Sequence, residues 1–578
     1  MEQVYLVLSF IGCWYGCVRF PRTKKMNAIS AIMLGYMTTI CYGALGAFVL
    51  SKFKIDISLL HISIVYTIFG VAIWGYIAIR KKTQCLEWRK EDILGALIGT
   101  IVIIAICLSV FQIYLHLNYY NTVDPSSHFC MAMDTLRNKY VSGMYFTQFH
   151  NAMFMGILIP LLPQTWNYKA FILADCFLAI MEYYVFYAFM IYLLKSKRKK
   201  YLPSLISVIY WLGYPLYSLV NGYVYWAMGA TIVIYIIWML CMYEEKVEQR
   251  KLCIGLLLLG CFSLCVCYVQ FIPCVLVAIV FVLVNDSYKK GNLHFDRKLF
   301  IKIVILGIMM CLIAALGYYL IFYSRRLDIF FALRDGVNTS KNLEILTLTP
   351  ILVFMLYKRF RNKSMNAVLC AGAACYFCYI LFVILASLNV MSSYYLFKNN
   401  YIFWILIFLI FIECWKDVND KEKIYIKSYI IVIATFLILM YTPHNNIETT
   451  DALSLDNSIY RYNAVLYREK CFRDRYAEKE INLIEYIGQN YDSKNEKVAL
   501  IGTNLIKGTC QWYGGITNQP FLFKSQINEE VIENYIQESG VAYVAMFYDS
   551  DAYEKNRTFI ESFEKVYSCD EGIIIRVK

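Results

Sequence analysis

Long apolar runs separated by short basic loops constrain this chain more than any other feature. The runs are about 15–25 residues long, the length that a helix needs to cross a hydrocarbon core of roughly 30 Å. Hydrophobic residues make up 60% of the 578 residues, and charged residues make up 17%. Soluble domains are about 45–50% apolar and about 25% charged. The sequence therefore predicts a polytopic α-helical membrane protein.

The charge is strongly positive, with a formal net charge of +13. The Lys and Arg residues gather in short loops between the apolar runs, at residues 22–25, 80–82 and 195–200. Basic loops of this kind face the cytoplasm in membrane proteins. The pattern predicts a multi-pass protein of the plasma membrane, in contact with the bilayer, and it argues against nucleic acid as a partner.

The same asymmetry predicts the topology. If the basic loops are cytoplasmic, the N-terminus and the polar loop after residue 118 both face outside. The next apolar segment, residues 151–166, is short and holds two prolines. It must stay on the outer face if residues 195–200 are to be cytoplasmic, so we expect residues 130–166 to form surface or re-entrant helices. Continued alternation gives about 14 spans, among them runs at 202–220, 223–243 and 427–442.

The composition changes after Thr442 and Pro443. Residues 497–501, 541–547 and 572–577 read as strands, and residues 481–491, 528–539 and 557–566 as amphipathic helices. We therefore expect four parts: N-terminal transmembrane spans (1–118), an outer loop with surface or re-entrant helices (119–168), a transmembrane core (169–443) and an extracytoplasmic α/β domain (444–578).

Asp124 and His128 are the candidate catalytic residues of the outer loop. A carboxylate near the membrane surface is partly desolvated, which raises its pKa and suits it to accept a proton from a hydroxyl group. His128 lies four residues further on and shares a face with Asp124 if this stretch is helical. Asp124 before Pro125 also fits a helix start, so a role as a helix cap is the competing interpretation.

Basic residues at predicted outer loops are candidates for binding a phosphate group. Arg325 and Arg326 follow the run at 299–323, and Lys398 precedes the run at 400–415 beside Tyr394 and Tyr395. Arginine suits phosphate because its planar guanidinium group binds two oxygens. The competing interpretation is interfacial anchoring by snorkelling cations and tyrosines. A weaker candidate for lining the site is His150.

Ionisable residues inside an apolar run suggest a different function. Asp175 and Glu182 lie within the run at 169–194, and Glu182 is the deeper of the two. Such groups are costly in a membrane and mark transport or proton-relay paths, although a buried hydrogen bond to a tyrosine also explains them. Asp549 and Asp551 read as a helix start rather than a metal site. We expect neither a metal nor another cofactor.

Four stretches resemble the GT-C superfamily of polytopic membrane glycosyltransferases. They are Asp124-Pro-Ser-Ser-His128, the run from His150 to Ile159, Tyr268-Val-Gln-Phe-Ile-Pro273 and Ser392-Ser-Tyr-Tyr-Leu-Phe-Lys398. The resemblance implies sugar transfer from a polyprenyl-phosphate donor to an envelope glycan, lipid or protein acceptor on the outer face.

The same resemblance assigns roles to residues. It implies that Asp124 is the general base and that Arg325, Arg326 or Lys398 contacts the lipid phosphate. About four predicted spans precede the outer loop, whereas the superfamily usually has one. The loop also lacks an Asp-x-Asp or Glu-x-Asp pair. A metal-independent, inverting reaction is therefore expected.

Two alternatives stay open at this point. A lipid-linked glycan transporter or flippase would use Glu182 and the interfacial cations as a path, although no repeat of hydropathy is evident. A polysaccharide polymerase would also use outer arginines on a lipid-linked glycan, but it would not need an Asp base so early in the chain.

Overall fold

The structure is a computed structural model of the chain. It describes most of residues 1–111, 124–289, 352–415 and 481–578, with gaps inside these ranges, the longest at residues 502–518. The predicted runs at 299–323 and 427–442, together with Arg325 and Arg326, lie outside the described residues. All structural statements below concern the described part of the chain.

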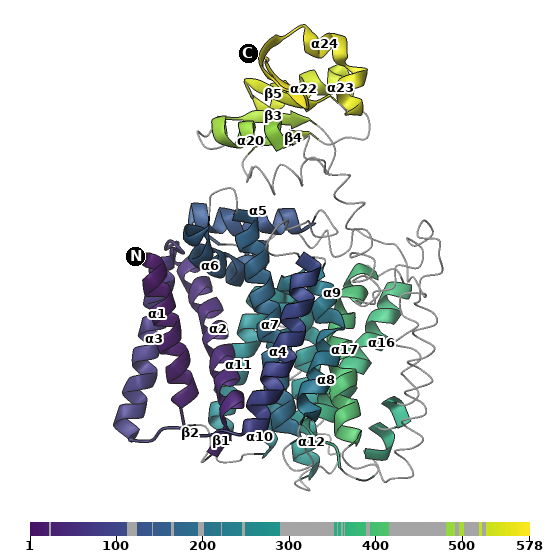
Figure 1. Ribbon diagram of the computed structural model, residues 1–578. Helices are drawn as coiled ribbons and strands as arrows, with labels where there is room; N and C mark the ends of the chain where they lie inside the picture. The colour runs from purple at the N-terminus through teal and green to yellow at the C-terminus, as the bar shows by residue number, and fades with distance from the viewer. Residues whose placement is uncertain are drawn as a thin grey trace.

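Long helices, drawn roughly parallel in Figure 1, form one bundle. Seven described stretches are long and apolar enough to cross a membrane, one of which is the 40-residue hairpin Arg250–Lys289. The chain is therefore a polytopic helical membrane protein. The long helices are α1 (Glu2–Arg19), α2 (Ala28–Lys52), α3 (Leu59–Arg80), α4 (Lys90–Phe111), α7 (Asn167–Leu193), α10 (Val224–Glu245), α11 (Arg250–Tyr268), α12 (Ile272–Lys289), α16 (Ala367–Ser387) and α17 (Ser393–Trp415).

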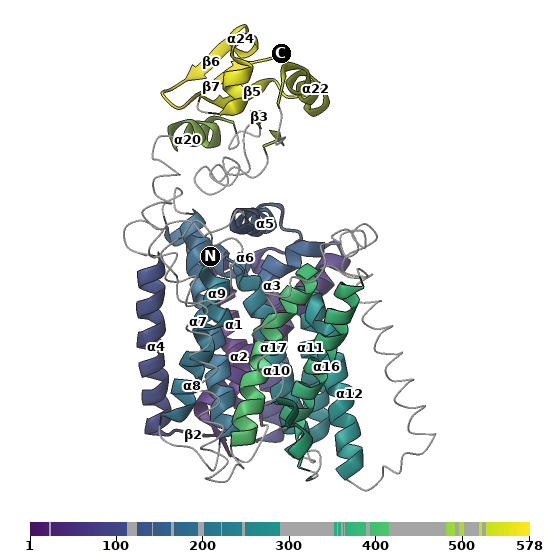
Figure 2. The same cartoon turned by 90° about the vertical axis from the view of Figure 1, so that its right-hand side faces the viewer.

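Helices α7 and α10 form the centre of the bundle. In the apolar 18-residue stretch of each helix, 94% is buried in α10 and 78% in α7, against 33% in α3 and in α4. A helix that is apolar on all sides is buried on all sides, so the sequences of α7 and α10 favour a position at the centre of the bundle. Helix α4 stands at the edge of the bundle in Figure 2. Residues that α7 and α10 contribute to a site are therefore held by packing from every direction.

The predicted run at 202–220 is broken into two helices, α8 (Leu202–Trp211) and α9 (Tyr214–Val220). Pro215 explains the break, since a proline lacks the N–H group and clashes with the carbonyl four residues earlier. Gly213 at the break lies against Trp404, and a Cβ atom there would be 2.4 Å from the indole nitrogen. A residue without a side chain is thus needed where α17 crosses the break.

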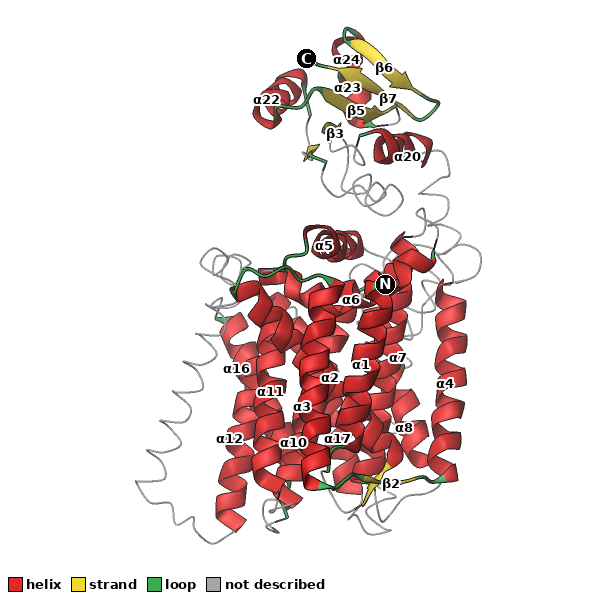
Figure 3. Cartoon of the chain, turned by 90° about the vertical axis from the view of Figure 1, so that its left-hand side faces the viewer, coloured by secondary structure: helices red, strands yellow, loops and turns green. Residues whose placement is uncertain are grey.

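Helix α5 (Asp124–Asn138) lies across one end of the bundle, as Figure 3 shows. It is followed by a 3₁₀ turn (Gly143–Gln148), the short helix α6 (Phe149–Leu158) and a second 3₁₀ turn (Ile159–Leu161). Pro160 lies in that second turn and ends the helix, because its ring cannot continue an α-helical hydrogen-bond ladder. This layer of short helices covers the ends of the long ones.

The opposite end of the bundle carries a small parallel sheet of β1 (Lys25–Asn27) and β2 (Cys85–Glu87). The Asn27 side chain caps α2 by accepting from the backbone N–H groups of Ile29 and Ser30. Its amide also donates to Asp92 on α4 at 2.6 Å. These contacts fix the ends of α2 and α4 to each other.

The C-terminal part is an α/β domain with a five-stranded sheet in the order β4-β3-β5-β7-β6. Strand β3 is parallel to β4 and β5, whereas β7 is antiparallel to β5 and β6. One apolar cluster packs α20 on one face, and a second packs the other helices on the opposite face. The elements are α20 (Ile481–Asn490), β3 (Val498–Ile501), β4 (Phe521–Leu522), α22 (Glu529–Ser539), β5 (Tyr543–Phe547), α23 (Asp551–Lys555), α24 (Arg557–Glu561), β6 (Glu564–Ser568) and β7 (Gly572–Arg576).

The predicted helix at 557–566 is only partly a helix. It ends at Glu561, and residues 564–568 form the edge strand β6. Glu564, Lys565 and Ser568 in this strand are exposed and none of its residues is buried, so its sequence lacks the alternation that reveals a half-buried strand. Pairing with β7 decides the conformation instead, aided by an ion pair of 2.9 Å between Glu564 and Arg576.

Candidate functional site

Lys398 lies in the second turn of α17 and is buried, with 2% of its surface exposed. Its ammonium nitrogen is 4.3 Å from the centre of the Tyr223 ring, 4.5 Å from that of Trp226 and 5.8 Å from that of Tyr225. A cation over an aromatic face is attracted by the ring quadrupole, more strongly so when both are desolvated. The structure thus holds a positive charge inside an aromatic cage.

The cage comes from the turn between α9 and α10. Gly222 has a φ of +68°, a left-handed conformation that favours glycine, and it turns the chain sharply. The backbone N–H of Tyr223 donates to the carbonyl of Ser218 at 2.7 Å and closes the turn. The indole of Trp226 donates to the backbone carbonyl of Lys398 at 2.9 Å. The cage is therefore bonded to the helix that carries the cation.

His128 on α5 joins this cage. Its ring centre is 4.4 Å from that of Tyr225. Its Nδ1 atom is buried and has no hydrogen-bond partner among the described residues. Burial, with a smaller contribution from the charge of Lys398, lowers the pKa of His128 to about 3. The imidazole is thus neutral near pH 7, which suits it to hydrogen bonding and not to donating a proton as an acid.

We call these five residues the Lys398 cluster: His128, Tyr223, Tyr225, Trp226 and Lys398. The cluster extends to the hairpin between α11 and α12, because the Tyr268 ring lies 5.9 Å from that of Tyr225. Residues of α5, of the α9–α10 turn, of that hairpin and of α17 therefore meet at one end of the bundle.

Among the predicted site residues, the structure brings His128 and Lys398 together. Asp124 is the first residue of α5, so it precedes His128 on one helix, but its side chain lies outside the described residues. Tyr394 and Tyr395 lie in the first turn of α17, and their side chains also lie outside the described part. Their roles, like those of Arg325 and Arg326, stay predictions.

His150 lies elsewhere. It is buried in α6, where its Nε2 atom is 3.3 Å from the carbonyl of Ile40 and its Nδ1 atom is 3.9 Å from the sulfur of Cys267. These contacts involve α2 and α11. The contacts that the structure describes for His150 do not include the Lys398 cluster, so its role in lining a site stays untested.

Glu182 is buried on α7, with 1% of its surface exposed. It accepts a hydrogen bond from the Tyr210 hydroxyl at 2.6 Å, and from the Tyr401 hydroxyl at 2.7 Å and 2.9 Å to its two oxygens. Asp175, two helical turns earlier on α7, accepts a hydrogen bond from the side-chain amide of Asn151. These bonds account for both buried carboxylates without a transport path.

Sequence reasoning missed the aromatic members of these two groups. The cage residues Tyr223, Tyr225 and Trp226 were absorbed into an apolar span, and so were Tyr210 and Tyr401. The only signal available was the density of aromatic residues just after Gly222, where a turn was expected. The cage residues could not be linked to Lys398 because it is more than 170 residues away in the chain from Trp226, whose indole bonds to its carbonyl.

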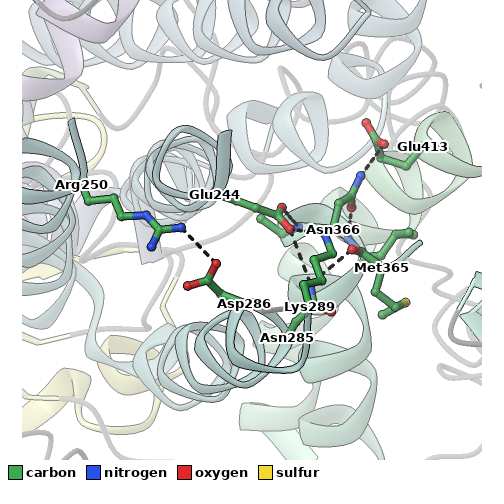
Figure 4. Close-up of polar contacts among 10 residues, drawn as sticks. Glu244, Arg250, Asn285, Asp286, Lys289, Met365, Asn366 and Glu413 are labelled. Carbon is green, nitrogen blue, oxygen red and sulfur yellow. Dashed lines mark hydrogen bonds and ion pairs between the residues drawn. The ribbon is translucent and has the colours of Figure 1, made fainter. Parts of the chain in front are cut away.

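A further polar group, drawn in Figure 4, joins the ends of α10 and α12 to the start of α16. Glu244 accepts from the Lys289 ammonium at 2.6 Å and from the backbone N–H of Ala367 at 2.7 Å, so it caps α16. We call this polar group the Glu244 cluster; its members are Glu244, Arg250, Asp286, Lys289, Asn366 and Glu413. Arg250 pairs with Asp286 at 3.0 Å, and the Asn366 amide donates to Glu413 at 2.7 Å.

The two clusters lie at opposite ends of the same helices. Tyr225 and Glu244 belong to the two ends of α10, and a separation of 19 residues spans about 28 Å at 1.5 Å per residue. Lys398 and Glu413 are likewise near the two ends of α17. Within the described part of the chain, no group of three or more His, Cys, Asp or Glu residues has the geometry to hold a metal ion.

The fold is similar to that of a solved membrane protein. The crystal structure of ArnT from Cupriavidus metallidurans bound to undecaprenyl phosphate matches 83% of this chain and 97% of its own chain. The TM-score is 0.50, and the sequence identity is 11%. No family model matches the chain, and no curated protein matches it by sequence. The likeness shows that the two chains share a fold, which agrees with the fold class that the sequence predicted.

Proposed function

We propose that this protein is a membrane glycosyltransferase that moves a sugar from a polyprenyl-phosphate donor to an envelope glycan, lipid or protein acceptor. The observation that carries the proposal is the buried cation Lys398, held beside the neutral His128 at the end of a GT-C bundle covered by α5. The ArnT structure with the same fold was solved with undecaprenyl phosphate bound. A cation supports phosphate binding because charge-assisted hydrogen bonds to phosphate oxygens are strong.

The orientation of the bundle supports a reaction at the outer face. The end opposite α5 carries the exposed basic residues Arg80, Lys81 and Lys82, next to strand β2. Basic residues of short loops favour the cytoplasmic side. The α5 end is then extracytoplasmic, and the α/β domain after the last predicted span is expected on the same side.

The proposed step is an inverting displacement. The acceptor hydroxyl oxygen forms a bond to the anomeric carbon of the sugar, and the bond from that carbon to the phosphate oxygen breaks. The electron pair of the broken bond stays on the lipid phosphate, where Lys398 neutralises the added negative charge. Asp124 takes the proton of the acceptor hydroxyl, and no metal takes part.

The remaining predicted residues fit this scheme as further contacts. Arg325 and Arg326 would bind phosphate oxygens, and Tyr394 and Tyr395 would donate hydroxyl hydrogen bonds near Lys398. His128 would act through a hydrogen bond to the substrate or to its neighbours, because a neutral imidazole both donates and accepts.

The test is a transfer assay with purified protein in lipid, supplied with polyprenyl-phosphate sugars and an envelope acceptor extract. Wild-type protein should release the polyprenyl phosphate and label the acceptor. The Asp124→Asn variant should insert and fold normally but lose transfer. Full transfer by Asp124→Asn, together with loss in Glu182→Gln, would contradict the mechanism and favour the transporter alternative.

A further inference from the structure

Glu182 is a buried carboxylate that the proposed transfer step does not use. Burying such a group costs free energy unless hydrogen bonds satisfy its oxygens. Both oxygens are satisfied here, by two tyrosine hydroxyls that are themselves fully buried. The arrangement therefore needs an explanation beyond tolerance of a charge in the membrane.

The carboxylate joins three helices at one point. Glu182 belongs to α7, Tyr210 to the last turn of α8, just before the break between α8 and α9, and Tyr401 to α17. The neighbouring Tyr214, just after the break, packs its ring 5.3 Å from that of Tyr401. Glu182 thereby fixes α17 laterally against the central helix of the bundle.

From Tyr401 the contacts lead directly to Lys398. The two residues are three positions apart on α17, so they lie on one face of the helix. The Tyr401 ring is 5.0 Å from that of Trp226, whose indole donates to the Lys398 carbonyl. Trp226 is thus held on one side by the residue that Glu182 fixes, and it supports the Lys398 ammonium on the other.

We propose that Glu182 is a positioning residue for Lys398, acting through Tyr401 and Trp226 to set where the cation meets the phosphate of the lipid substrate. The inference rests on the proposed function. A binding group must be held to within about 0.5 Å by supporting contacts, and a fully hydrogen-bonded set of buried rings provides that support. Loosening Tyr401 should therefore weaken phosphate binding without removing any group that touches the phosphate.

The experiment measures the affinity of the purified full-length chain for a polyprenyl phosphate in detergent. Tyr401→Phe removes the hydroxyl bonded to Glu182 and keeps the ring on Trp226. Glu182→Leu removes the acceptor, whereas Glu182→Gln keeps one acceptor oxygen. We expect affinity losses of about tenfold for Glu182→Leu, several-fold for Tyr401→Phe and the smallest loss for Glu182→Gln, because an unmet buried hydroxyl disturbs its surroundings.

Tyr187→Phe is the matched control. It also removes a buried tyrosine hydroxyl from α7, but that hydroxyl donates to the Asp92 carbonyl at 2.8 Å, near the other end of the bundle. Its affinity for the lipid should stay within about twofold of wild type even if its melting temperature falls. Equal affinity losses in Tyr187→Phe and Tyr401→Phe would reduce Glu182 to a general stabiliser and overturn the proposal.

A double-mutant cycle separates this inference from the proposed function. If Glu182 acts through Lys398, Glu182→Leu should cost little further affinity in a Lys398→Met background. Additive losses would overturn the positioning role. If Lys398→Met alone binds the lipid as well as wild type, the proposed phosphate contact fails. If Lys398→Met loses affinity but Tyr401→Phe and Glu182→Leu keep it, the positioning inference alone fails.

Discussion

The Lys398 cluster and the Glu244 cluster occupy opposite ends of α10 and α17, and their charged groups lie in different surroundings. In the Glu244 cluster each charge meets an opposite charge, a backbone group or a side-chain amide, and the contacts tie α10, α12, α16 and α17 together. In the Lys398 cluster a buried ammonium lies against three aromatic rings, next to a neutral imidazole with an unmet nitrogen.

We propose that the Glu244 cluster serves the packing of the bundle and that the Lys398 cluster serves its function. Carboxylates that form ion pairs and cap a helix stabilise the packing, and these contacts satisfy the hydrogen-bonding capacity of their oxygens. A buried cation on aromatic rings is instead suited to an anion of the substrate. Under the proposed function, we expect chemistry at the α5 end and a purely structural role for the opposite end.

The largest expected effect tests whether chemistry belongs to the α5 end. Asp124→Asn should lower the transfer rate by about 10²–10⁴-fold, the usual contribution of a general base. A radiolabelled-sugar transfer assay measures it. Asp134→Asn, on the same helix α5, is the control and should keep most of the wild-type rate. Similar losses in both variants would reassign Asp124 to a structural role such as helix capping.

The next effect concerns the Glu244 cluster. Glu244→Gln should lower the free energy of unfolding by about 1–3 kcal/mol, because the Lys289 ammonium loses its partner and α16 loses a charged cap. Thermal unfolding in detergent should show the shift, with lipid-phosphate affinity unchanged. A change in affinity without a change in stability would break the assignment of this end to structure.

His128 gives a pH-dependent prediction. Its pKa is lowered in the folded state to about 3, so the unfolded chain binds the extra proton first as the pH falls. The stabilising effect of the neutral ring is complete above the unfolded pKa of about 6.5 and declines as the pH falls from there toward 3. Stability should fall by at most about 1.4 kcal/mol per pH unit from this group.

The check compares wild type with His128→Phe, which cannot titrate. Melting temperatures of the two should run parallel above pH 7 and diverge below pH 6, with wild type losing more. Parallel curves down to pH 4 would show that His128 is not held neutral beside Lys398, and the contrast between the clusters would weaken.

The smallest effect concerns the Arg250–Asp286 pair, whose side chains are 19% and 15% exposed. Arg250→Met should cost at most about 1 kcal/mol of stability, as partly solvated ion pairs do. Thermal unfolding again measures it. A cost as large as that of Glu244→Gln would mean that the whole cluster acts as one network and not as a central carboxylate with a weaker neighbour.

The sequence predicted the bundle because apolar length and basic loops are local properties. It also singled out Lys398 as a candidate, since a cation at the boundary of an apolar run is visible in the chain, and the role of Lys398 stays a prediction. It could not predict the cage, because the turn at Gly222 brings Tyr223 and Trp226 to Lys398 through tertiary packing. The break at Gly213 was missed although Pro215 signalled it, because the run remained apolar on both sides.

Glu182 shows the same limit from the other direction. Its position in an apolar run marked it as costly and suggested transport as readily as a hydrogen bond. Only the packed structure shows that Tyr210 and Tyr401, on two other helices, meet both of its oxygens. Strand β6 was missed for a similar reason, since its pairing partner and not its own sequence sets its conformation.

The most direct test of the central claim is the affinity of Lys398→Met for a polyprenyl phosphate, measured by native mass spectrometry beside wild type and Lys289→Met. Lys289 is the matched control, a lysine paired with Glu244 at the opposite end. We expect a loss of at least about tenfold for Lys398→Met, since charge-assisted contacts are strong, and none for Lys289→Met. Unchanged binding by Lys398→Met would contradict it.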